Sequence, residues 1–184
     1  ASRGSYASVI ATHPIDKARR MIYYKPVGSM SRKNREFTIP SMSYTIGELH
    51  TMYNTKTIVH CGSYEIAGAL HNKLNGFNAI CQDSDNRVKS LESWMGQKDC
   101  IFLSVAMEQG LDLKGPEYTV NIIAKVNFPY LGDDWVKERN NLDKWSWYNK
   151  VAEVNVVQAC GRTTRSPDDY SEILKILLNL TYQG

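Results

Sequence analysis

Four residues near the carboxyl end of the chain have the types and the spacing for chemistry on a charged ligand. On a helix, Gln158, Gly161, Arg162 and Arg165 would fall within one stripe about 100° wide. Guanidinium groups are planar and permanently charged, and they bind phosphate through two parallel hydrogen bonds. The glycine would let another surface approach the backbone. The stripe therefore predicts a site for a multiply charged oxyanion. The spacing leaves a second interpretation open, in which both arginines pair with nearby carboxylates.

Apolar residues surround this stripe on nearly every side, which predicts a helix packed deep in the domain with the polar stripe as its exposed part. These apolar residues are Val151, Ala152, Val154, Val156, Val157, Ala159 and Cys160. Pro167 disfavours helical geometry at Ser166, and we expect the helix to end there.

The composition predicts one globular domain, because 184 residues with 42% hydrophobic content suffice for a single core. The net charge of +3 permits contact with nucleic acid without arguing for it. No run of about 18 apolar residues and no signal-peptide pattern occurs, which predicts a soluble, intracellular protein without a membrane partner. We expect it in the cytoplasm, or in the nucleus if it is eukaryotic. The chain does not begin with Met, and we treat it as part of a longer protein.

The cysteines and histidines do not form a metal-binding pattern. No two cysteines stand as Cys-x-x-Cys, which excludes the usual zinc and iron–sulfur spacings and favours buried free thiols in a reducing compartment. The residues concerned are Cys61, Cys81, Cys100 and Cys160, with His13, His50, His60 and His71.

Short apolar runs alternate with amphipathic helical stretches between residues 20 and 126, which predicts an α/β fold with a mainly parallel sheet and helices on both faces. The expected strands are Arg20 to Tyr24, Thr57 to Cys61, Asn78 to Cys81, Cys100 to Val105 and Val120 to Val126. The expected helices are Ser43 to Tyr53, a helix capped by Ser63, Arg87 to Met95, Asp133 to Asn140 and the helix of the arginine stripe. Glu172 to Leu180 fits a final strand or a helix, since periodicity does not decide between them.

Ligands of open parallel sheets gather at the carboxyl ends of the strands, so the loops that follow the expected strands are candidate sites. Gly62 and Ser63 begin a helix, where unpaired backbone NH groups and the helix dipole favour phosphate. The alternative is that Ser63 only caps the helix. In the next loop, Asp112 could accept hydrogen bonds from a sugar hydroxyl, and Ser104 could hold phosphate. The sequence around Gly110 also fits an ordinary turn.

A third loop, Asn127 to Trp135, begins a region rich in aromatic residues. Beside basic residues, such side chains could stack on unpaired bases, and packing of the loop against the core is the alternative. The further aromatic residues are Trp145, Trp147 and Tyr148, and the basic residues are Lys125, Lys137, Arg139, Lys144 and Lys150.

The sequence lacks the usual means of holding a triphosphate. It contains no Gly-x-x-x-x-Gly-Lys-Ser/Thr loop, no Gly-x-Gly-x-x-Gly and no acidic cluster for magnesium. Arginines suited to phosphate, without a cradle for the nucleotide, predict that a second domain binds the triphosphate.

In their order, these motifs resemble those of the second RecA-like motor domain of superfamily 2 ATP-dependent DNA helicases, in the XPD/DinG-like branch. Ile58 to Tyr64 resembles helicase motif IV, Ser104 to Asp112 resembles motif V, and Gln158 to Arg165 resembles motif VI. The resemblance runs across almost the whole chain. It implies a three-layer RecA-like domain over residues 20–184, and it makes residues 1–19 the segment that arrives from the preceding motor domain.

This resemblance also implies roles for single residues. Arg162 and Arg165, with Gln158, would be catalytic residues that face the terminal phosphate of ATP, which the first motor domain would bind together with Mg²⁺. Residues near the nucleotide would be Gly110, Asp112 and Gly161. Contacts with the backbone of single-stranded DNA would come from Ser63 and Ser104.

The implied partners are single-stranded DNA and the first RecA-like domain of the same parent protein. Any iron–sulfur cluster of the parent protein would lie outside this segment. The resemblance makes DNA repair an expected role. The chain alone would be inactive. A non-catalytic adaptor that binds nucleic acid through the same fold is the main alternative. A generic nucleotide-binding or methyltransferase-like domain ranks lower, because no glycine-rich loop follows the first strand.

Overall fold

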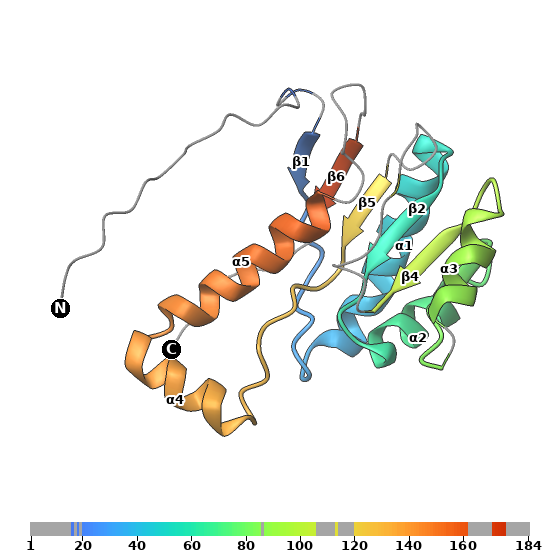
Figure 1. Cartoon of the computed structure of the whole chain (residues 1–184). Coiled ribbons are helices and arrows are strands. Elements are labelled where there is room, and N and C mark those ends of the chain that lie inside the picture. Colours follow the sequence, from blue (N-terminus) through green and yellow to red (C-terminus); the bar gives the residue numbers. More distant parts are fainter. Residues whose placement is uncertain are drawn as a thin grey trace.

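Six parallel strands form one sheet in the computed structural model, which describes residues 16, 18, 20–85, 87–105, 113, 120–161 and 171–175. Within that part of the chain the strands are β1 (Arg20–Tyr24), β2 (Thr57–His60), β3 (Ala79–Cys81), β4 (Ile101–Ser104), β5 (Val120–Ile123) and β6 (Ser171–Lys175). They lie side by side in the order β1-β6-β5-β2-β4-β3 (Figure 1). Every neighbouring pair is parallel.

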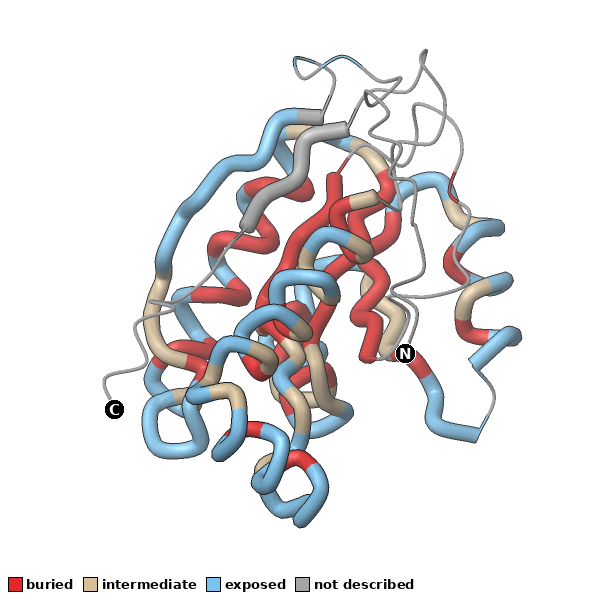
Figure 2. Tube along the Cα trace, turned by 60° about the vertical axis from the view of Figure 1, so that its left-hand side comes forward, coloured by how far each residue is buried: buried red, intermediate tan, exposed pale blue. Residues whose placement is uncertain are grey.

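Helices cover both faces of this sheet, and the strands in its centre are buried between them (Figure 2). The helices are α1 (Arg35–Tyr53), α2 (Tyr64–Lys73), α3 (Arg87–Met95), α4 (Asp134–Asp143) and α5 (Ser146–Cys160). The helices α1 and α2 pack on one face, whereas α3 and α5 pack on the other. The expected three-layer α/β architecture with a parallel sheet is therefore confirmed.

The alternation of side chains along the central strands produces these two cores. Val59, Leu103 and Ile122 stand in register and pack under α1 and α2. One residue earlier on each strand, Ile58 and Phe102 point to the opposite face, where Trp94 of α3 stacks on Phe102 with ring centroids 5.2 Å apart. A strand buried on both faces is mostly apolar, which explains the nearly continuous apolar runs in the sequence.

The first helix begins earlier than its sequence predicts. It starts at Arg35 rather than Ser43 and contains Pro40, which lacks the NH group that a helix interior uses. The added turns bury Ile39 and Met42 in the core under the sheet. Tertiary packing thus outweighs the local cost of the proline.

The helix expected to carry the arginine stripe ends sooner than predicted. Its last residue is Cys160, and Gly161 forms the C-cap, so the stripe does not continue along one helix through Gly161. The prediction of a deeply packed helix is also wrong, because Val157 is 69% exposed and Val154 is 43% exposed. The sequence left the last element open between a strand and a helix, and the structure has a strand there, β6 (Ser171–Lys175).

Candidate functional site

The carboxyl ends of β2 and β5 form a point where the chain turns away in two directions. These strands are neighbours at the centre of the sheet. From β2 the chain passes through α2 to β3 on one side, and from β5 it passes through α4 and α5 to β6 on the other. Crossovers that diverge in this way leave a crevice outside the strand ends, which is where open α/β sheets bind ligands.

Gly62 lies at this crevice and meets the loop that follows β5. Its φ of 73° is in the left-handed region, which favours glycine. A Cβ atom on Gly62 would overlap the Oδ1 of Asn127. The loop after β2 and the loop after β5 are therefore in contact, with the backbone of Gly62 against the side chain of Asn127. Together they line a depression of about 340 Å³ with Lys125, Tyr130 and Tyr148.

The N-terminus of α2 opens onto the same edge. Ser63 is its N-cap, and the Oγ atom accepts a hydrogen bond from the Ile66 NH at 3.3 Å. The capping role that the sequence offered as an alternative is thus present. It does not exclude a phosphate ligand, since the first turn of a helix has other NH groups without helical partners. Nearby, Arg35 of α1 forms a two-pronged ion pair with Glu65 of α2.

Ser104, at the end of β4, is buried and faces another side chain. Its Oγ atom lies 3.3 Å from the Oε1 of Gln82, which also accepts a hydrogen bond from the Val105 NH at 2.9 Å. The amide of Gln82 reaches the hydroxyl of Tyr64 at 3.4 Å. Gln82 therefore joins β3, β4 and α2 at the carboxyl edge, and it was not a candidate from sequence. The expected contact of Ser104 with DNA stays a prediction.

The aromatic region beyond β5 packs largely on itself. Phe128 stacks on Tyr148 with ring centroids 5.2 Å apart, and Trp135 meets Trp147 edge to face at 5.3 Å. Tyr130 is 79% exposed and Trp135 is 64% exposed. Packing within this region is therefore present, whereas stacking of the exposed rings on unpaired bases stays a prediction.

The end of α5 lies away from the carboxyl edge. The Asn155 side chain donates to the backbone O of Asn127, just after β5, whereas the side chain of Asn121 in β5 donates to the backbone O of Ala159. The helix therefore runs antiparallel to β5. Gln158 is half-buried near its end, and Gly161 follows beside the first half of the strand.

The predicted site residues thus fall into two groups. Gly62, Ser63 and Ser104 lie at the carboxyl ends of the strands, and Gln158 and Gly161 lie at the other end of α5. Four further predicted residues are outside the described part of the chain. They are Gly110, Asp112, Arg162 and Arg165.

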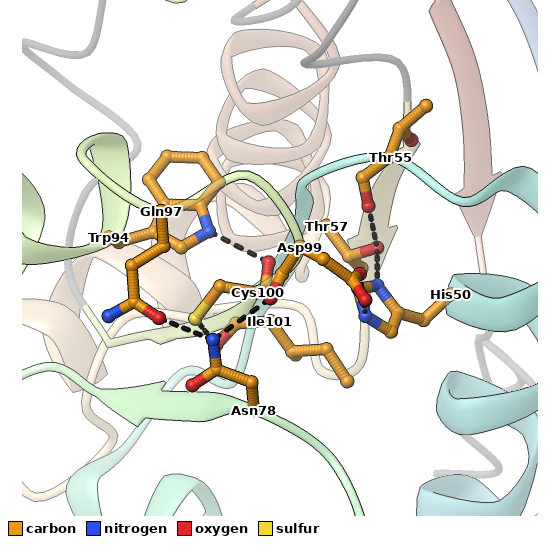
Figure 3. Close-up of polar contacts among 9 residues, drawn as sticks. All are labelled: His50, Thr55, Thr57, Asn78, Trp94, Gln97, Asp99, Cys100 and Ile101. Atoms are coloured by element: carbon orange, nitrogen blue, oxygen red, sulfur yellow. Dashed lines mark hydrogen bonds and ion pairs between the residues drawn. The ribbon is translucent and has the colours of Figure 1, made fainter.

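A polar cluster lies at the amino end of β2, which begins at Thr57. Figure 3 shows its side chains. His50 of α1 is buried, with its Nδ1 atom 2.9 Å from the Oγ1 of Thr57 and its Nε2 atom 2.8 Å from an Oδ1 of Asp99. Burial lowers the pKa of His50, and the charge of Asp99 opposes this shift only in part. The neutral imidazole donates from Nε2 to the Asp99 carboxylate, and its Nδ1 atom faces the Thr57 hydroxyl, which also lies 3.4 Å from the backbone O of Thr55. The cluster therefore links α1 to the start of β2 and to the loop before β4.

Cys61, Cys100 and Cys160 are buried as expected, whereas Cys81 is half-buried. None of these four cysteines forms a disulfide, and burial raises the pKa of Cys100 to about 11 and also raises the pKa of Cys61. In the described part of the chain, no group of three or more His, Cys, Asp or Glu side chains could hold a metal ion. No helix described by the structure is long and apolar enough to cross a membrane.

Comparison with known proteins identifies a family. The sequence model of the helicase C-terminal domain family matches residues 46–177 of this chain. Xpd4 of S. tokodaii superposes with a TM-score of 0.63 and 20% identity, covering 95% of this chain and 37% of its own. A structure of XPD in its apo form superposes with a TM-score of 0.69 and 16% identity, covering 83% of this chain and 34% of its own. A structure of XPD helicase superposes with a TM-score of 0.70 and 16% identity, covering 84% of this chain and 30% of its own.

At these identities the solved structures show a shared fold. The chain spans about a third of the length of each of them. No curated protein matches the sequence.

Proposed function

Because this chain belongs to the helicase C-terminal domain family, we propose that it is the second motor domain of an ATP-dependent DNA helicase. The family and the RecA-like fold that its motifs predicted are confirmed. The observation that carries the proposal is the extent of the family match, which runs from α1 to the end of β6 and includes all three motifs.

In this function, Arg162 and Arg165 approach ATP that is bound by the first motor domain. Negative charge spreads over the oxygens of the transferring phosphoryl group, and a guanidinium from a second domain stabilises that charge. Gln158 and Gly161 would lie beside this group, while Gly110 and Asp112 would contact the nucleotide. Mg²⁺ would be bound with ATP, mainly by the first domain.

The carboxyl edge of the sheet is suited to the backbone of single-stranded DNA. Ser63 at the N-terminus of α2 offers backbone NH groups to a phosphate, and Lys125 adds a cation beside Gly62. Ser104 would contribute once its hydroxyl exchanges Gln82 for a phosphate. Closure of the cleft between the domains on ATP binding would then move DNA by its phosphates.

Steady-state ATP hydrolysis by the full-length parent protein, with and without single-stranded DNA, tests this proposal. We expect Arg165→Ala to lower kcat by about 10³-fold or more, since an arginine of this type contributes about that factor. The matched control is Arg139→Ala, because Arg139 is an exposed arginine on α4 that pairs with Asp143 at 3.0 Å. Equal turnover of the Arg165 variant and the control would refute the proposal.

A further inference from the structure

Asn121 is a polar residue at the centre of the sheet, and its side chain is fully buried. It stands in register with Ile58 on one neighbouring strand and Ile173 on the other. An amide in such apolar surroundings costs free energy unless it forms hydrogen bonds. The side chain of Asn121 therefore needs a hydrogen-bond partner within the protein.

The amide of Asn121 holds the last turn of α5. Its Nδ2 atom donates to the backbone O of Ala159 at 2.8 Å. The last four carbonyl groups of a helix lack the usual NH partner four residues on. At Ala159 the sheet supplies a side-chain donor beside the NH of the C-cap Gly161. Within the same turn, the NH of Gly161 bonds to the O of Val157 at 3.0 Å. The position of Gly161 is thus tied to a rigid central strand.

A second asparagine holds α5 one turn earlier on the same side. The Nδ2 atom of Asn155 donates to the backbone O of Asn127 at 2.9 Å. The space between Asn155, Ala159 and the strand ends is reduced to a cavity of about 10 Å³, which is no larger than one water molecule. The C-terminal half of α5 is therefore in close contact with β2 and β5.

Apolar packing alone would fix this half of the helix poorly. The residues of α5 that pack against Ile123 and Val126 are mostly small, namely Ala152, Ala159 and Cys160, with the partly buried Val156 beside them. Methyl groups present a low relief that permits a helix to slide or rotate, whereas a hydrogen bond needs a defined distance and direction. The two asparagines therefore set the register of α5 along β5.

We propose that Asn121 and Asn155 are positioning residues that place the end of α5, and with it the point from which the chain continues into Arg162 and Arg165. This inference rests on the proposed function of those arginines. Misplacement of a catalytic group by about 1 Å can cost about 100-fold in rate, so tethers that act on the helix end matter to the transition state.

The test measures how tightly the full-length parent protein, bound to single-stranded DNA, holds ADP and ADP with aluminium fluoride. The second ligand mimics the transferring phosphoryl group, and the first does not reach the arginines. We expect Asn121→Leu, which has a similar volume and no donor, to weaken the analogue by about 10- to 100-fold. The affinity for ADP should change by no more than about twofold, which is below 0.5 kcal/mol, because ADP does not reach the arginines.

Two further variants make the result decisive. Asn140→Leu is the matched control, since Asn140 is a buried asparagine of α4 and the same change there should leave both affinities unaltered. Asn155→Ala alters the half-buried tether and should weaken the analogue in the same sense as Asn121→Leu. If thermal unfolding shows that Asn121→Leu does not fold, the Asn155 variant decides the question.

Arg165→Ala separates this inference from the function on which it rests. If Arg165→Ala weakens the analogue while the two asparagine variants match Asn140→Leu, the positioning role is wrong and the proposed function stands. If Arg165→Ala also leaves the analogue affinity unchanged, the proposed function fails and the inference fails with it. A double variant of Asn121 and Arg165 should lose no more than Arg165→Ala alone, because both act through the same contact.

Discussion

Gly62 shows how one residue shapes the carboxyl edge. Its backbone has a φ of 73°, and a side chain there would meet Asn127. We expect Gly62→Ala to lower the free energy of unfolding by about 1–3 kcal/mol, from the strained backbone and the displaced amide. Urea unfolding measures this change.

Gly68 offers a matched control for that substitution. It lies in the middle of α2, and nothing is within 4 Å of where its Cβ would stand. Gly68→Ala should therefore raise the free energy of unfolding by about 0.5–1 kcal/mol, as alanine does in a helix interior. If Gly62→Ala raised the free energy of unfolding as Gly68→Ala should, the strain assigned to Gly62 would be absent.

Residues with local signals could be found from the sequence, and residues with distant partners could not. Ser63 was found because a serine before an amphipathic stretch is a typical N-cap. Asn121 and Gln82 were missed because their partners, Ala159 and Ser104, are far away in the chain. A polar residue inside or directly after an apolar run is the signal that could have identified them.

At the scale of elements, the His50 cluster makes the attachment of α1 dependent on pH. Burial lowers the pKa of His50 below its usual 6.5. Below about pH 6.5 the unfolded chain binds a proton that the native chain resists, so the free energy of unfolding falls as the pH falls. Above that pH the histidine is neutral in both states, and its contribution no longer changes.

Urea unfolding at pH 7.5 and 5.5 tests this dependence. The wild-type chain should lose more stability between these values than His50→Gln, which keeps an amide donor near Asp99 and does not titrate. His71→Gln is the control, because His71 is exposed on α2. Equal losses for the wild type and His50→Gln would show that another group causes the acid sensitivity.

Element boundaries were predictable where local chemistry sets them. The bounds of α3 agree with the sequence prediction at both ends, and those of β1 do as well. The start of α1 and the end of α5 were misjudged. In α1 the burial of Ile39 and Met42 outweighs Pro40, and in α5 the apolar residues suggested burial although Val157 lies open to solvent.

At the scale of the whole molecule, the strand order is the feature that sequence could not supply. Alternating runs predicted a parallel sheet, yet the placement of β2 between β4 and β5 depends on pairings between distant segments. That order is what brings Gly62 against Asn127 and places the two groups of site residues at opposite ends of α5.

In the proposed function, the chain by itself would hold one side of each composite site. We therefore expect the isolated 184-residue chain to hydrolyse no ATP and to bind single-stranded DNA more weakly than the parent protein does. Phosphate release and fluorescence anisotropy measure the two activities. Turnover that co-purifies with the chain and survives in an Arg165→Ala preparation would identify a contaminating enzyme, whereas turnover lost in that preparation would contradict the account.

The most direct measurement asks which residues face the terminal phosphate of bound ATP. The full-length parent protein, with single-stranded DNA, would be irradiated with an ATP analogue that carries a photoreactive group on its γ-phosphate, and the labelled peptides identified by mass spectrometry. We predict labelling in the segment from Gln158 to Arg165 as well as in the first motor domain. Labelling confined to the first domain, at saturating nucleotide, would contradict the claim that this chain supplies half of the ATP site.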